Sequence, residues 1–167
     1  MSSSLSNDLH LKLVPGSNNP ALLQSIISMW LQERVIPKPE AERRVMEVVY
    51  AIVDSGENIV GVTTAYVGQL PGGGEPVWLL RMFIRSSKRA FQGMAVKGAL
   101  QWEILESTFR YLQTLPVSSV NLSFKGALLV TENRKFWSER WRRAFATRGW
   151  HPVARDAAGQ YIHFRAF

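Results

Sequence analysis

The feature that most limits the fold is a strand, a basic loop and a long helix that follow one another in the middle of the chain. Residues 77–84 form an apolar run with the length and composition of a largely buried strand. Gly93 lets the backbone turn closely before a helix that begins at Val96. That helix carries apolar residues at helical spacing, at Leu100, Ile104, Leu105, Phe109 and Leu112. A strand that leads directly into such a helix is typical of a domain that mixes both element types.

The start of this helix is a candidate anion site. The first N–H groups of a helix lack partners and carry the positive end of its dipole, so they bind phosphate groups. The loop before it is basic, with Arg85, Lys88 and Arg89 followed by Gln92. An ordinary strand–loop–helix unit with a solvated basic loop is the alternative interpretation. The glycine run at residues 72–74 lacks the Lys-Ser/Thr of a P-loop and precedes a strand, so we interpret it as a plain loop.

Length and composition predict one domain. The chain has 167 residues, enough to bury roughly 70% of the surface that it exposes when unfolded. We expect residues 1–8 to form a flexible tail and residues 9–167 to form a single domain. No run of about 20 apolar residues occurs, which argues against a membrane span. The absence of cysteine excludes disulfides and Cys-ligated zinc and fits a cytoplasmic protein, and the three histidines lack metal-ligand spacing, so no metal site is expected.

Strand and helix patterns divide the rest of the chain without an internal repeat. Asn19 followed by Pro20 predicts a capped helix start, and Gly149 predicts a helix end. The expected strands are residues 9–14, 50–53, 59–67, 77–84, 127–130, 151–155 and 160–164. The other expected helices are residues 40–48 and 134–148.

This order of elements resembles the GNAT acetyltransferase superfamily over residues 9–164. Gly93-x-Ala95 is similar to the second half of the family's acyl-CoA pyrophosphate signature, R/Q-x-x-G-x-G/A. Ile59-Val60-Gly61-Val62 looks like the family's central hairpin, and residues 144–150 look like its late helix and Gly-aromatic end. The resemblance implies an α/β (α+β) fold with a mixed, mainly antiparallel central sheet of six or seven strands, flanked by helices on both faces.

Two positions depart from the family pattern. Ala90 stands where the signature has Arg or Gln, so Arg89 and Gln92 are candidates to share that role. Phe145 stands where many members have a tyrosine that protonates the departing thiolate, and phenylalanine has no proton to give. These departures leave two hypotheses open: an N-acetyltransferase, or a catalytically degenerate GNAT-fold module that binds nucleic acid or an assembly partner.

For the enzyme, the resemblance implies direct transfer of an acetyl group from acetyl-CoA to an amine. A strand edge would bind the pantetheine and polarise the thioester carbonyl at the point where family members splay two strands apart, and a basic loop would hold the pyrophosphate. The implied cofactor-binding residues are Met82, Phe83, Ile84, Arg89, Gln92, Gly93, Met94, Ala95 and Asn133. A general base must take the proton from the amine, and the candidates are Glu132, Tyr66 and Glu47.

Basic residues are the second functional signal. Arg81 stands inside an apolar strand, where it can hold an anionic substrate or point to solvent. The net charge of +7 favours anionic partners. The late helix is strongly cationic, and Arg142 and Arg143 are candidates to bind nucleic acid or an acidic protein. A solvated basic face over buried tryptophans is the alternative interpretation. We expect a monomer or a homodimer.

Overall fold

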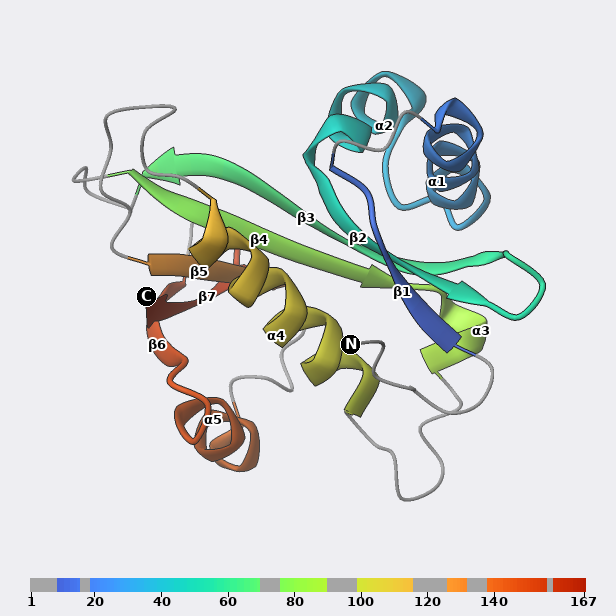
Figure 1. Cartoon of the computed structure of the whole chain (residues 1–167). Helices are drawn as coiled ribbons and strands as arrows, with labels where there is room; N and C mark the ends of the chain where they lie inside the picture. The colour runs from blue at the N-terminus through green and yellow to red at the C-terminus, as the bar shows by residue number, and fades with distance from the viewer. Residues whose placement is uncertain are drawn as a thin grey trace. The chain divides into compact units, whose positions relative to one another are not determined.

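A computed structural model of the chain describes residues 9–15, 19–69, 76–89, 99–115, 126–131, 138–155 and 158–167. The elements are β1 (Leu9–Leu13), α1 (Pro20–Gln32), α2 (Lys38–Arg44), η1 (Val45–Glu47), β2 (Val48–Asp54), β3 (Ile59–Gln69), β4 (Pro76–Ile84), α3 (Ser86–Arg89), α4 (Ala99–Thr114), β5 (Gly126–Thr131), α5 (Glu139–Ala146), β6 (His151–Arg155) and β7 (Tyr161–Ala166) (Figure 1). This order confirms the predicted succession and adds one helical turn, α3.

The strands form one seven-stranded sheet in the order β1-β2-β3-β4-β5-β7-β6. The pairs β1–β2, β2–β3, β5–β7 and β6–β7 are antiparallel, and β4–β5 is parallel. The expected mixed, mainly antiparallel sheet is therefore confirmed. The chain divides into two compact units: unit 1 is Met1–Thr64 with Met82–Arg110, and unit 2 is Ala65–Arg81 with Tyr111–Phe167. The expectation of a single domain stays a prediction.

In unit 1, helices cover both faces of the β2–β3 pair. Alternate residues of β2 point to opposite faces: Ala51 and Val53 pack in one apolar cluster, whereas Ile52 packs in another. The first cluster contains Ile26, Met29 and Trp30 of α1 with Ala41 of α2 and Val45 of η1. The second contains Ile104 of α4. Because both faces are buried, Ala51–Val53 of β2 and Ile59–Val62 of β3 are continuous apolar runs without the alternation of a half-exposed strand.

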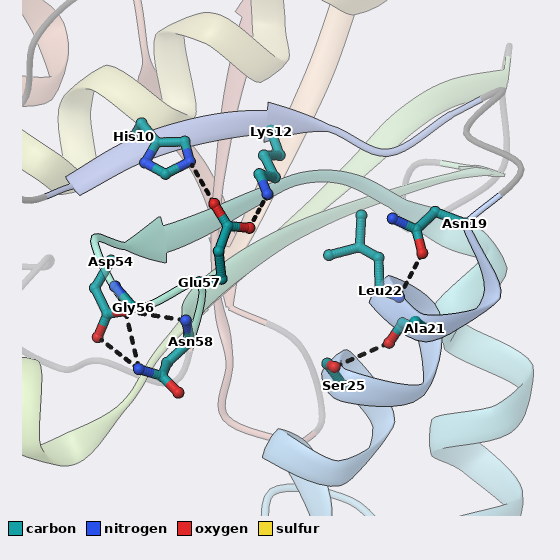
Figure 2. Close-up of polar contacts among 10 residues, drawn as sticks. All are labelled: His10, Lys12, Asn19, Ala21, Leu22, Ser25, Asp54, Gly56, Glu57 and Asn58. Atoms are coloured by element: carbon teal, nitrogen blue, oxygen red, sulfur yellow. Dashed lines mark hydrogen bonds and ion pairs between the residues drawn. The ribbon is translucent and has the colours of Figure 1, made fainter.

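The start of α1 follows its sequence signal. Asn19 Oδ1 accepts a hydrogen bond from the Leu22 N–H at 3.1 Å (Figure 2). Pro20 occupies the first turn. The predicted helix over residues 40–48 is wrong at both ends. It begins at Lys38 and its last residues form η1, and Val48 already pairs with Thr64 as a strand residue. The run of β-branched side chains that begins at Val48 favours a strand over a further helical turn.

In unit 2, α5 packs through Phe145, which is 1% exposed and lies 4.6 Å from the His163 ring in a stacked arrangement. The predicted helix over residues 134–148 is wrong at Ser138, which has an extended backbone, and after Ala146, where α5 (Glu139–Ala146) ends. Residues 134–137 lie outside the described residues. A serine just before the first turn is a typical N-cap. Gly149, with φ of +77°, follows the helix, and the Trp150 N–H donates to the Phe145 carbonyl at 3.0 Å, so the predicted end signal is confirmed.

Strand β5 begins with a glycine because its neighbour β7 comes very close. A Cβ atom on Gly126 would lie 2.2 Å from the Arg165 carbonyl oxygen and 2.7 Å from the Phe164 ring.

No helix within the described ranges is both long enough and apolar enough to pass through a bilayer.

Candidate functional site

Strand β4 pairs with β5 in parallel over the residues that the structure describes. The described register is Trp78↔Ala127, Leu79↔Leu128 and Leu80↔Leu129. Strand β4 runs on to Ile84, and Val130 and Thr131 at the end of β5 pair with Ile162 and Tyr161 of β7.

The end of β4 is anchored through its side chains. Phe83 packs against the cluster of α1 and α2, while Met82 and Ile84 belong to the cluster of α4, so successive residues point to opposite faces. On the β3 side, a Cβ atom on Gly61 would lie only 2.7 Å from the Phe83 carbonyl oxygen, and the Arg85 N–H donates to the Val60 carbonyl at 2.8 Å. The predicted role of residues 82–84 requires a rigid backbone, and these contacts supply one.

A helical turn follows β4 where the sequence predicted a loop, so that prediction is wrong over residues 86–89. Glu33 provides the physical reason, because its Oε2 accepts hydrogen bonds from the Ser86 N–H at 3.2 Å and from Ser86 Oγ at 3.0 Å. A carboxylate at the first N–H groups stabilises a helix start. Arg85 is held by the Ile59 carbonyl at 2.7 Å and by Gln32 Oε1 at 3.2 Å.

Several predicted site residues lie outside the described part of the chain. These are the backbone and side chains of Gln92, Gly93, Met94, Ala95, Glu132 and Asn133, and the side chain of Arg89. Their predicted roles stay predictions.

Unit 2 brings together two candidates that the sequence treated separately. Arg81 Nη2 donates a hydrogen bond to Tyr66 Oη at 2.7 Å, and the guanidinium carbon of Arg81 lies 4.6 Å from the centre of the Tyr66 ring. Both residues are half-buried. The hydroxyl accepts from a cation, so its own proton remains available for donation to a third group. Arg81 therefore fixes the orientation of Tyr66.

Glu47, the candidate base in unit 1, belongs to a charged network. Arg43 donates hydrogen bonds to Glu47 Oε1 at 2.6 Å and to Glu40 Oε1 at 2.8 Å. Arg44 also donates to Glu40 Oε1. These two arginines lower the pKa of the Glu40 carboxyl to about 2. The other oxygen of Glu47, Oε2, is buried and has no hydrogen-bond partner among the described residues.

Thr64 is a second residue with an unsatisfied buried oxygen in the described part of the chain, and it was not among the predicted site residues. Its Oγ1 is buried without a hydrogen-bond partner in the described part of the chain. The neighbouring Thr63 is satisfied, because its Oγ1 lies 2.7 Å from Thr108 Oγ1 and 3.3 Å from the Tyr50 N–H, which donates to it. The sequence signal that could have indicated Thr64 is the pair of hydroxyl side chains, Thr63 and Thr64, between apolar residues of β3.

A hollow of about 480 Å³ lies in unit 1 between the polar side of α1 and the β2–β3 turn, with Arg85 at its wall. Its acidic groups are engaged in structure. Glu57 forms ion pairs with Lys12 and with His10 (3.6 Å), and Asp54 Oδ1 accepts from the N–H groups of Gly56 and Asn58 at 3.0 and 2.9 Å (Figure 2). These contacts hold the turn, so the hollow offers no unengaged carboxylate for chemistry.

Positive charge is concentrated in unit 2. Its sequence holds ten basic and four acidic residues, whereas unit 1 holds ten and nine. On α5, Arg140, Arg142 and Arg143 are all exposed, and Arg143 forms an ion pair with Glu139. The inward positions of the same helix are Phe145, which is buried, and Trp141, which is half-buried. The predicted basic face over an aromatic face is present on the described part of this helix.

No family model and no curated protein matches this sequence. Solved structures do match. Arabidopsis thaliana NAA60, solved in complex with acetyl-CoA, is 11% identical with a TM-score of 0.57, over 95% of this chain and 99% of that one. A Bordetella pertussis protein described as a GNAT-family acetyltransferase is 16% identical with a TM-score of 0.56, over 99% of both chains. A GNAT-family acetyltransferase from Streptococcus pneumoniae is 10% identical with a TM-score of 0.54, over 95% of this chain and 99% of that one. The chain therefore has the GNAT fold.

Proposed function

We propose that the protein is an N-acetyltransferase that uses acetyl-CoA as its co-substrate and an amine as acceptor. The observation that carries the proposal is the likeness of the whole chain to solved acetyltransferases with the GNAT fold, one of them in complex with acetyl-CoA. Acetyl-CoA would supply an activated thioester. The backbone of residues 82–84 would bind its pantetheine, the segment from Arg89 to Ala95 its pyrophosphate, and Asn133 would add a polar contact.

Proton transfer requires an acceptor for the proton of the amine and a donor for the departing thiolate. We assign the first role to Glu47 or Glu132, since an ionised carboxylate accepts protons. Tyr66 is the proposed donor, because its hydroxyl accepts from Arg81 and keeps its proton for a third group. This assignment removes the need for a tyrosine at position 145, which lies in the core of unit 2.

The first test is a thermal unfolding titration with acetyl-CoA. At a concentration 100 times the dissociation constant, binding to the native state raises the free energy of unfolding by about 2.7 kcal/mol. We expect Gly93→Glu to abolish this gain, because a bulky anion at the proposed pyrophosphate site repels the ligand. The matched control is Gly73→Glu, the same change in the glycine run that we interpret as a plain loop. A folded Gly93→Glu protein with the full acetyl-CoA response would overturn the assignment of this loop.

A second candidate function is nucleic-acid binding through α5, either by a non-catalytic module or by a transferase that acts on nucleic acid. The observation that favours it is the concentration of positive charge in unit 2 and the exposed arginines of α5. Arginine presents a planar fork of donors that matches a phosphate group.

The test for this function is fluorescence anisotropy with a labelled RNA duplex and a DNA duplex across a salt series. Each phosphate contact contributes about −0.9 to the slope of log K against log salt. We expect Arg142→Gln with Arg143→Gln to make the slope shallower by roughly two such contacts. Arg34→Gln with Lys38→Gln, two exposed cations of unit 1, is the matched control and should leave the slope unchanged. Salt-independent binding would contradict phosphate contacts, and no binding to either duplex would point to an acidic protein instead.

A further inference from the structure

We infer that Glu47 and Thr64 form a recognition site for a protonated amine, one that binds through at least two N–H donors. The inference deepens the proposed function, since such a group is the ground-state form of an amine acceptor. It rests on contacts within unit 1 alone.

Two buried oxygens that lack partners in the described chain are the starting point. Glu47 Oε2 and Thr64 Oγ1 are each inaccessible to solvent, although their residues differ in exposure: the Glu47 side chain is 14% exposed and Thr64 is 5% exposed. Buried polar atoms in native proteins nearly always have a hydrogen-bond partner, and a charged one is especially unfavourable alone. A ligand that donates to both atoms would remove that penalty.

The topology brings the two residues to one end of a strand pair. Glu47 is the last residue of η1, and the next residue, Val48, is the direct register partner of Thr64 in β3. Val48 packs in the same apolar cluster as Val62, two residues before Thr64, so alternation along β3 turns the Thr64 side chain toward the face that α1, α2 and η1 cover. Glu47 belongs to the element on that face.

The chemistry of the pair selects the ligand. Arg43 occupies Glu47 Oε1 but leaves Oε2, so the available group is half of an ionised carboxylate. That oxygen accepts hydrogen bonds and repels anions. Thr64 adds a hydroxyl oxygen, which also accepts. A primary ammonium carries three N–H donors and one positive charge, and it can satisfy both oxygens at once.

A metal ion fits this pair less well. Divalent cations take six or more oxygen ligands or a tetrahedral set, whereas the pair offers two oxygens. Among the described residues, no three histidine, aspartate or glutamate side chains gather as a metal site would require.

The test uses methylammonium chloride as the probe and thermal unfolding as the readout, at constant ionic strength set with sodium chloride. Tetramethylammonium is the matched cation, because it carries the same charge without N–H donors. We expect methylammonium to raise the melting temperature of the wild-type protein progressively up to about 100 mM, and tetramethylammonium to have no such effect. Both Glu47→Gln and Thr64→Val should lose at least half of the methylammonium response.

Glu42→Gln is the matched control, since Glu42 lies on α2 but pairs with Lys38 on the surface and should keep the full response. Thr64→Val keeps the shape of the side chain, so it tests the site even if Glu47→Gln weakens the Arg43 network. An equal response to the two cations, or a full methylammonium response in both site variants, overturns the inference and leaves a trapped water as the partner of these oxygens.

Acetyl-CoA titration of the same variants separates this inference from the proposed function. If acetyl-CoA stabilises the protein but methylammonium does not, the proposed transferase function is supported and the amine site is contradicted. If methylammonium raises the melting temperature of the wild-type protein but not of Glu47→Gln, and acetyl-CoA does not bind, the amine site is supported and the proposed transferase function is contradicted.

Discussion

Replacing Phe145 by alanine should lower the free energy of unfolding by about 3–5 kcal/mol, the range found when a buried aromatic side chain is removed from a core. The Phe145 ring is 1% exposed, stacks on His163 at 4.6 Å and lies 6.3 Å from the Trp141 ring. Its removal leaves a cavity that these rings line. Urea denaturation followed by tryptophan fluorescence measures the change.

The matched control lies on the opposite side of the same helix. The Arg143 side chain is 78% exposed, and its ion pair within the described residues is with Glu139, which is also exposed, so Arg143→Ala should change stability by no more than about 0.5 kcal/mol. If the two substitutions had similar effects, α5 would not pack through Phe145, and the division of this helix into an aromatic face and a basic face would be wrong.

Acid should destabilise the protein already between pH 7 and pH 5, because of His163. Burial lowers the pKa of its imidazole from 6.5 to about 4. Above pH 6.5 the ring is neutral in both the folded and the unfolded chain, so it contributes no pH dependence. Below pH 6.5 the unfolded chain binds a proton that the folded chain does not, and stability falls until the folded pKa is reached. The expected loss is about 2 kcal/mol between pH 7 and pH 5.

His163→Phe provides the comparison, because it keeps an aromatic ring opposite Phe145 and removes the titration. In this variant the free energy of unfolding should be nearly flat from pH 7 to pH 5. The Glu40 carboxyl, which is paired with Arg43 and Arg44 and has a pKa of about 2, titrates below this window. A wild-type profile that matches the variant's would mean that the imidazole is not held neutral by burial.

The fold was largely predictable because its signals are local. The Asn19-Pro20 start of α1, the hairpin of β2 and β3 and the glycine after α5 each depend on neighbours in the sequence, and all were confirmed. The errors arose where two local preferences compete. Val48 can extend a helical stripe or begin a β-branched strand, and strand pairing with Thr64 decides the outcome. Ser138 similarly fits a helix interior in sequence but takes an extended conformation and starts α5.

The candidate site was less predictable because it depends on contacts between distant residues. The sequence singled out Tyr66 and Arg81 separately. Only the structure shows that Arg81 donates a hydrogen bond to Tyr66 from the neighbouring strand. Thr63 and Thr64 look equivalent in sequence, and only α4, through Thr108, distinguishes the satisfied hydroxyl from the unsatisfied one. A pattern of residue types carries no information on which hydrogen bonds remain to be made.

If the proposed function holds, the composition of the basic face on α5 has a chemical consequence. No lysine follows Lys135 in the sequence, so every cationic side chain from α5 to the last residue is arginine, apart from the histidines. A lysine side chain loses its charge when it is acylated, whereas the guanidinium of arginine stays protonated at neutral pH and is a poor nucleophile. This surface would therefore keep its charge in the presence of a reactive acyl donor.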